Sequence, residues 1–307
     1  DISINAPASA TPITVIHSEY GECVTNIIVT PRDVNSWATK LRLLSGRALD
    51  EANPVLDTEL LIPGARARVA VIQQPLSPSG LAFSFRRHRS KPWTLPLFIQ
   101  SKMLTPLAAG LLDFIIQGNR TLIVAGTRSA GKTSLLGSLM VQIMRSIRII
   151  TVEDTLELPV HELKELKYDI QSLKVRSVIT GSKEEISAAE GIRTSLRMGD
   201  SSLIIGEVRS EEAIALYEAM RVGALANVVA GTIHGDSPYG VYDRVVNDLK
   251  VPPTSFKATD IIVICNPVKS ASGLKQKRRV VQITEVGKNW NKDPLAEKGF
   301  TDLMIYN

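Results

Sequence analysis

The stretch TLIVAGTRSAGKTS, Thr121–Ser134, decides the fold of this chain. Its first five residues are mostly apolar and predict a buried strand, and the residues after its last glycine predict an amphipathic helix. Between them, Gly126, Gly131, Lys132 and Thr133 fit the phosphate-loop pattern G-x-x-x-x-G-K-[ST]. In such a loop backbone N–H groups surround the phosphates, and the helix N-terminus adds its positive end. The stretch therefore predicts a nucleoside triphosphate site on a parallel α/β sheet.

The residues of this loop have expected places at the nucleotide. Lys132 should reach the β- and γ-phosphates, and the Thr133 hydroxyl should bind Mg²⁺. The chain lacks the N-K-x-D base-reading motif of small GTPases and the G-x-S-x-G elbow of serine hydrolases. We therefore expect ATP and Mg²⁺ as cofactors. The expected ATP-binding residues are Gly126, Thr127, Arg128, Ser129, Ala130, Gly131, Lys132, Thr133 and Ser134.

The composition is that of an ordinary globular protein. The 307 residues allow about two domains, and 44% hydrophobic residues suffice for a sizeable core. A net charge of +5 fits a nucleotide, an acidic partner or a membrane surface, and does not decide among them. Cys23 and Cys265 lack metal-ligand spacing and are expected to be free thiols in a reducing cytosol. The chain begins without methionine, so we expect a fragment of a longer protein.

The first part of the chain, up to residue 89, predicts a small α+β domain. Strand-like runs surround a single helical pattern, whose apolar stripe begins at Val34 and which should stop at Gly46. Tyr20-Gly21 lies between two β-rich runs and predicts a hairpin. The further expected strands cover residues 67–74 and 80–88.

The second part of the chain predicts a larger α/β domain. Residues 90–100 contain two prolines, which break regular structure, and we expect an interdomain linker there. From residue 101 to 307 short apolar strands alternate with helical segments, as in a parallel sheet covered on both faces. The longest apolar runs, Leu107–Ile116 and Val222–Ile233, are too short to span a bilayer.

Glu207 follows the apolar run Ser202–Ile205, and we expect it just past the end of a buried strand. In parallel sheets, ligands bind at the carboxyl ends of the strands. Glu207 should therefore polarise the attacking water or hold Mg²⁺ through water. The alternative, an acid that caps the next helix, fits Glu211 and Glu212 better.

A second acidic group follows the strand that ends at Val152. It consists of Glu153, Asp154 and Glu157, three acids within five residues, which beside a triphosphate would need a metal ion as counterion. A solvated loop is the alternative. The expected Mg²⁺ set is Thr133, Glu153, Asp154, Glu157 and Glu207.

His234 ends another apolar strand, on the same predicted sheet edge, where it could sense the γ-phosphate. Arginines flank these motifs and could act as fingers that stabilise transition-state charge, or simply lie on a solvated face. They are Arg193, Arg197, Arg209 and Arg221, with Arg66, Arg86 and Arg87 in the first domain.

The phosphate loop, the acidic group, Gly206-Glu207 and the strand end Thr232–His234 follow one another in an order that resembles the type II/type IV secretion ATPase superfamily. These are ring-forming motors of secretion systems, pili and the archaeal flagellum. The stretches Leu49–Asp57, Gly64–Val69, Phe83–His88 and Thr259–Pro267 are similar to its archaeal branch.

The resemblance implies a PAS-like N-terminal domain, a RecA-like ATPase domain and a homohexamer. It makes Glu207 the Walker B glutamate and His234 the histidine-box residue, and it makes Arg66 and Arg86 arginines that approach the phosphates. The expected catalytic residues are Glu207, Glu153, His234, Arg86, Arg66 and Arg209. The chain departs from the family pattern at Thr155 and Gly199, where proline is common, and at Ala224, where a histidine often follows glycine.

We expect an ATP-hydrolysing motor in the cytoplasm, which meets the inner face of the membrane through a platform protein and does not insert itself. A RecA-type nucleic-acid translocase is the alternative, because the basic stretch Leu274–Arg279 could follow a phosphate backbone. A solvated hairpin tip explains that stretch more simply, so a nucleic-acid partner is not favoured. A nucleotide-binding scaffold without turnover is a third possibility.

Overall fold

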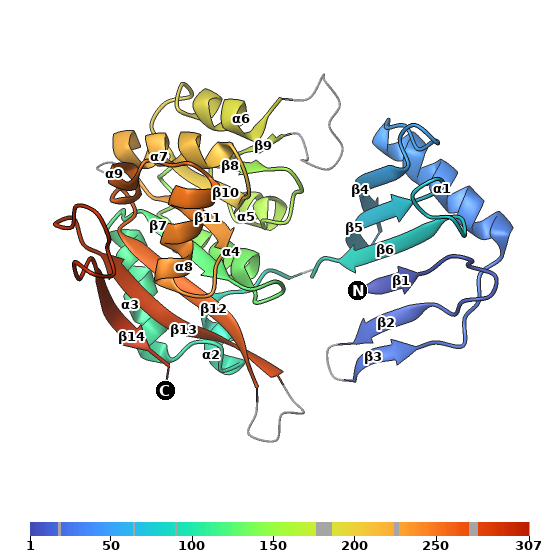
Figure 1. The fold of residues 1–307 in the computed structure, drawn as a ribbon, viewed down its shortest axis with the longest axis horizontal. Coiled ribbons are helices and arrows are strands. Elements are labelled where there is room, and N and C mark those ends of the chain that lie inside the picture. Colours follow the sequence, from blue (N-terminus) through green and yellow to red (C-terminus); the bar gives the residue numbers. More distant parts are fainter. Residues whose placement is uncertain are drawn as a thin grey trace. The chain divides into compact units, whose positions relative to one another are not determined.

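The computed structural model describes residues 1–17, 20–63, 65–89, 91–175, 186–223, 227–269 and 276–306 (Figure 1). These residues form two compact units, which meet in the sequence at residue 90. Among the residues named above, Gly64, Ser90, Ala224, Leu274 and Lys275 lie outside the described part.

The smaller unit is an antiparallel sheet with one helix (Figure 1). The strand order is β3-β2-β1-β6-β5-β4. The strands are β1 (Ile2–Ile4), β2 (Thr14–His17), β3 (Gly21–Val24), β4 (Val55–Ile62), β5 (Ala65–Ile72) and β6 (Ala82–Arg87). Strands β2 and β3 pair as the hairpin expected around Tyr20-Gly21. Strand β4 was not foreseen.

Helix α1 (Pro31–Ser45) has clear local start and stop signals. The Thr30 side chain accepts from the Asp33 amide, and the Asp33 carboxylate accepts from the Thr30 amide, which makes a capping box. The helix ends at Gly46, whose φ of 66° is left-handed. The helix buries Val34, Ala38 and Leu41, residues spaced three or four apart, in the core of the unit.

The larger unit is built on an eight-stranded sheet in the order β14-β13-β12-β7-β11-β10-β8-β9. The pairs from β12 to β9 are parallel, and β12, β13 and β14 are antiparallel. The strands are β7 (Leu122–Gly126), β8 (Ile149–Glu153), β9 (Ile170–Lys174), β10 (Ser202–Val208), β11 (Val229–His234), β12 (Ile261–Lys269), β13 (Gln276–Val286) and β14 (Phe300–Ile305).

Helices cover both faces of this sheet (Figure 1). They are α2 (Leu95–Gln100), α3 (Pro106–Gln117), α4 (Lys132–Met140), α5 (Val160–Glu165), α6 (Ala188–Ser195), α7 (Glu212–Gly223), α8 (Pro238–Asp243), the π-helical turn Arg244–Asp248 and α9 (Pro253–Phe256). No helix among the described residues is long and apolar enough to cross a bilayer.

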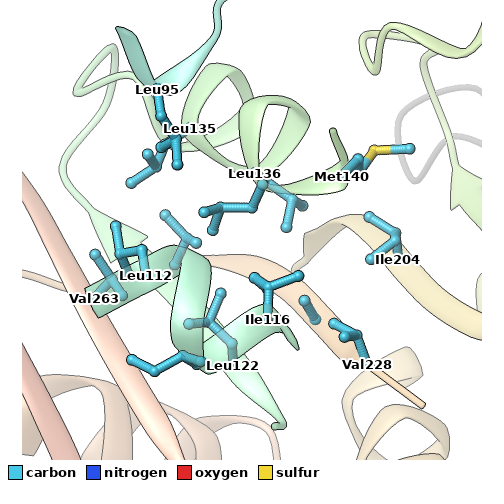
Figure 2. Packing of buried hydrophobic residues seen from close by; sticks show 14 of the residues in the cluster. Leu95, Leu112, Ile116, Leu122, Leu135, Leu136, Met140, Ile204, Val228 and Val263 are labelled. Carbon is cyan, nitrogen blue, oxygen red and sulfur yellow. The ribbon is translucent and has the colours of Figure 1, made fainter. Parts of the chain in front are cut away.

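The core lies in two layers, one on each face of the sheet. On one face Leu112 and Ile116 of α3 and Leu135 and Leu136 of α4 pack over Leu122 of β7 (Figure 2). On the other face the cluster includes α7 side chains and the alternate strand residues, such as Leu216, Ile123 and Ile205. Burial on both faces explains why the strands read as continuous apolar runs.

The fold class predicted from the sequence is confirmed: a RecA-like P-loop domain with a smaller α+β domain. Two details differ from expectation. Within the expected linker, Leu95–Gln100 is helix α2, and its Leu95 and Phe98 are buried in the core of the larger unit. Apolar residues at helical spacing run from Leu135 to Met144 and predict a helix of that length, but α4 ends at Met140.

Candidate active site

The phosphate loop connects β7 to α4 through backbone that needs glycine. Gly126 has a φ of 156°, and a Cβ there would lie 2.0 Å from the Cys265 carbonyl oxygen on β12. Gly131, just before α4, has a φ of 97°. The glycines of the loop therefore have a direct steric cause: Gly126 lets the β12 backbone approach closely, and both glycines adopt positive φ angles.

Lys132 lies at the centre of the site. Its side chain is buried and donates to the carbonyls of Gly126 and Thr127, both at 3.0 Å. Its Nζ also lies 3.3 Å from His234 Nδ1. The lysine is thus held over the loop that it would use to bind phosphate, and it is linked to the end of strand β11.

His234 and Glu207 lie on the neighbouring strands β11 and β10, so the parallel sheet brings them together. His234 Nε2 lies 3.1 Å from Glu207 Oε1. Burial, and then the charge of Lys132, lower the pKa of His234, although the charge of Glu207 opposes them. The two predicted residues form one contact beside the phosphate loop.

Glu207 lies inside β10, not past its end as predicted from the sequence. The register with β11 shifts between Ile205 and Val208, and the strand continues to Val208. The buried Thr232 hydroxyl donates to the Gly206 carbonyl at 2.6 Å and supports the chain at this irregularity. A local bulge thus lengthens the strand and leaves Glu207 half-buried at the sheet edge.

Arg209 binds two carboxylates. One guanidinium nitrogen contacts Glu207 Oε2, and the other lies 3.1 Å from Asp154 Oδ2. Burial alone would raise the pKa of Glu207, but the Arg209 hydrogen bond and the charges of Arg209, His234 and Lys132 hold it below its usual range. Glu207 is therefore a carboxylate, and Arg209 joins it to the acidic group.

Glu153 has a structural task in this group. Its side chain is 2% exposed, and its Oε1 accepts from the amides of Glu157 and Leu158 at 2.8 and 2.9 Å. A Cβ at Gly206 would lie 2.9 Å from Glu153 Cγ, so the glutamate packs over the backbone of β10. Among the described residues, no three His, Cys, Asp or Glu side chains are grouped to hold a metal ion by themselves.

The remaining expected residues are spread over the two units. Arg66 pairs with Glu59 at 3.6 Å in the smaller unit, where Arg86 lies on strand β6. In the larger unit Arg193 pairs with Glu218, and the Arg221 guanidinium lies 3.5 Å from the Ser255 hydroxyl. Arg197 has no such partner within the described ranges. Among the described residues of the larger unit, no contact joins Arg193, Arg197 or Arg221 to the phosphate loop.

Glu212 begins helix α7, in agreement with the expectation that Glu211 and Glu212, and not Glu207, suit the start of the next helix. Glu212 accepts from the amides of Arg209 and Ser210 and from the Ser210 hydroxyl, contacts typical of a helix N-terminus.

The two cysteines of the chain are free thiols, as expected from the sequence, and burial raises the pKa of Cys265 to about 12.

Asn266 is a site residue that sequence reasoning missed. Its Oδ1 accepts from the Thr127 amide at 3.3 Å, and its Nδ2 donates to the Asp236 carbonyl at 3.2 Å. It thereby joins the phosphate loop to the segment after His234. Its position after the apolar part of β12 was the available signal, since polar residues after apolar runs also marked Glu207.

Several known proteins resemble this chain. A Mycobacterium tuberculosis protein named for conjugal transfer is 29% identical over 215 residues, which cover 69% of this chain and 59% of that protein. An uncharacterized Methanocaldococcus jannaschii protein is 31% identical over 219 residues, 69% of this chain and 29% of the relative. The chain therefore spans less than two thirds of the length of either relative.

The fold is that of a solved ATPase structure. The X-ray structure of the Legionella pneumophila ATPase DotB is similar over 92% of this chain and 75% of DotB, with a TM-score of 0.63 and 16% identity. The Bordetella pertussis type IV secretion system protein PtlH is 25% identical over 85% of this chain and 82% of its own length. Residues 34–291 match the family described as Type II/IV secretion system protein, and this chain belongs to that family.

Proposed function

We propose that this chain is an ATP-hydrolysing motor of a type II or type IV secretion, pilus or archaellum-like machine. One observation carries the proposal: Lys132, His234 and Glu207 form a continuous series of contacts from the phosphate loop to a half-buried carboxylate. A phosphate-binding lysine and a carboxylate that can orient water are two of the groups that hydrolysis of a γ-phosphate uses, and here they lie in one site.

The residues of the loop fit a nucleotide. Gly126 and Gly131 give the loop backbone the positive φ angles that glycine adopts without strain, and Lys132 supplies a buried positive charge within the loop. Bound Mg²⁺ would neutralise charge on the phosphates, and Thr133 with Glu207 would hold it, Glu207 through water. Glu207 would position and polarise the attacking water. His234 contacts both Lys132 and Glu207 and would sense whether Lys132 binds the γ-phosphate.

The assembly is part of the proposal. We expect a ring of identical chains, with six as the size that the family resemblance implies. Arg66 and Arg86 of the smaller unit would approach the phosphates of this chain or of a neighbour. We also expect a cytoplasmic location, with membrane contact through a platform protein. Membership of the archaeal branch of the family stays a prediction, because the relatives named above come from both bacteria and an archaeon.

The dependence of the Mg²⁺-dependent ATPase rate per chain on protein concentration tests the motor. A rate that rises with concentration and is abolished by Glu207→Gln supports an assembled enzyme, and loss of the rise in Arg86→Ala assigns that residue to the assembly. The control is Arg42→Ala, which removes the same charge from the exposed face of helix α1 in the same unit. Wild-type hydrolysis in Glu207→Gln would refute the role of Glu207.

A nucleic-acid translocase is a second candidate, favoured by two observations. Lys277 and Arg278 are exposed on β13, and a relative is named for conjugal transfer. A translocase should bind DNA with strong salt dependence and hydrolyse ATP faster in its presence. An ATPase rate that DNA leaves unchanged at low salt would count against it.

A further inference from the structure

The described part of the basic stretch, Gln276–Arg279, belongs to strand β13 and not to a hairpin tip as expected from the sequence. Arg278 lies opposite Pro267 on β12. Two residues earlier on β12, Cys265 lies opposite Gly126, the first residue of the phosphate loop. The pairing of β13 with β12 and of β12 with β7 thus brings one end of this basic stretch near the phosphate loop.

The face on which Arg278 projects follows from its neighbours. Val280 packs against the core cluster that contains Leu135 and Leu136 of α4, the helix that begins at the phosphate loop. Side chains alternate along a strand, so Arg278 projects on the same face as Val280. Lys277, one residue away, projects on the opposite face.

The side chain of Arg278 reaches the loop itself. A Cβ built on Gly131 would lie 3.8 Å from Arg278 Cδ and 3.3 Å from Met103 Cε. Cδ is bonded to Nε, the first nitrogen of the guanidinium, so the guanidinium lies near Gly131 of the phosphate loop. The residue is exposed, and among the described residues its guanidinium has no hydrogen bond or ion pair.

We propose that Arg278 is a nucleotide-binding residue that contacts the α- or β-phosphate of a nucleotide held by the loop Gly126–Ser134, an inference that rests on the proposed function. Loop amides of this kind surround the α- and β-phosphates, which ADP and ATP share, and the Lys132 side chain extends toward the β- and γ-phosphates. A guanidinium binds phosphate oxygens in pairs, with a geometry that an ammonium does not reproduce. ADP and ATP should therefore depend on Arg278 equally.

Titration of the full chain with fluorescent ADP and with a non-hydrolysable ATP analogue tests this contact. A hydrogen bond between charged groups contributes enough that Arg278→Ala should weaken both affinities about tenfold or more. Arg278→Lys should restore part of the loss. The matched control is Lys277→Ala, which removes the same charge from the opposite face and should bind within about twofold of wild type.

Each other result is decisive. Unchanged affinity in Arg278→Ala overturns the inference and leaves the proposed function intact. Equal losses in Arg278→Ala and Lys277→Ala would mean a general effect of positive charge, and they overturn the inference too. DNA binding lost in both variants with nucleotide affinity intact would assign the strand to nucleic acid. A wild-type chain that binds neither nucleotide refutes the proposed function itself. Should Arg278→Ala fail to fold, Arg278→Gln gives the same test.

Discussion

Lys132 Nζ lies 3.3 Å from His234 Nδ1, although both side chains are bases that can carry a positive charge. An ammonium group can only donate, so Nδ1 must accept. The proton of the neutral ring is then assigned to Nε2, which lies 3.1 Å from Glu207 Oε1 and can donate to it. A neutral His234 therefore joins the phosphate-binding lysine to the carboxylate, and a protonated ring would place a proton against the ammonium.

Replacing His234 by alanine should slow hydrolysis while nucleotide binding persists. The variant loses a hydrogen bond to the charged Glu207, which is worth about 1.5–3 kcal/mol, or roughly ten- to a hundredfold in kcat. Affinity for ADP should stay within a few-fold of wild type, because Lys132 keeps its loop contacts. Steady-state rates and ADP titrations measure the two effects separately. His161→Ala is the control, since that histidine is exposed on α5 and should change neither.

The pH dependence of hydrolysis should report on Arg209. In the folded chain burial raises the pKa of Glu207, but Arg209, His234 and Lys132 together lower it below its ordinary value, so Glu207 stays ionised to a lower pH than an ordinary glutamate. Arg209→Ala removes the largest of the lowering contacts. The acid limb of the pH–rate profile should then move to higher pH.

Arg209→Lys tests the geometry of this contact. One guanidinium spans Glu207 and Asp154, and a single ammonium cannot reproduce that fork, so the lysine variant should restore the limb only in part. Arg193→Ala is the control, because its partner Glu218 lies on α7 outside the site. An acid limb that stays in place in Arg209→Ala would exclude this role for the arginine.

The sequence predicted most of the larger unit because local patterns determine its elements. Apolar runs marked the strands. Because ligands bind at the carboxyl ends of parallel strands, the sequence also placed Glu207 and His234 at one edge of the sheet with Lys132. The misses have non-local causes. Strand β10 continues through Glu207 because β11 and the Thr232 hydroxyl support its bulge. Asn266 joined the site only through pairing of β12 with β7, which a single run of sequence does not show.

Gly126→Ala should remove nucleotide binding and destabilise the larger unit. The new methyl group would lie 2.0 Å from the Cys265 carbonyl oxygen, so a strand or the loop must shift. Gly110→Ala is a matched control on α3, where nothing lies within 4 Å of the built Cβ. Alanine should stabilise that helix by about 0.5–1 kcal/mol. Urea denaturation of both variants measures the contrast, and equal stabilities would contradict the steric argument.

Asp57 and Arg68 form a paired contact in the core-facing part of the smaller unit. The Arg68 guanidinium donates to Asp57 Oδ1 at 3.1 Å and to Oδ2 at 2.6 Å, and Asp57 is 6% exposed. Arg47 also donates to the Asp57 carbonyl, so three parts of the unit meet here. Removing Asp57 takes away the carboxylate that binds the Arg68 guanidinium through two of its nitrogens.

Asp57→Ala should therefore destabilise the chain by about 1.5–3 kcal/mol, because Arg68 loses two hydrogen bonds to a charged group while its side chain stays largely out of water. Replacing the pair together, as Asp57→Leu with Arg68→Met, should cost much less, since neither variant residue needs a counterion. Urea denaturation followed by circular dichroism measures both free energies of unfolding. If the double variant were as unstable as Asp57→Ala, packing and not the lost hydrogen bonds to Arg68 would explain the loss.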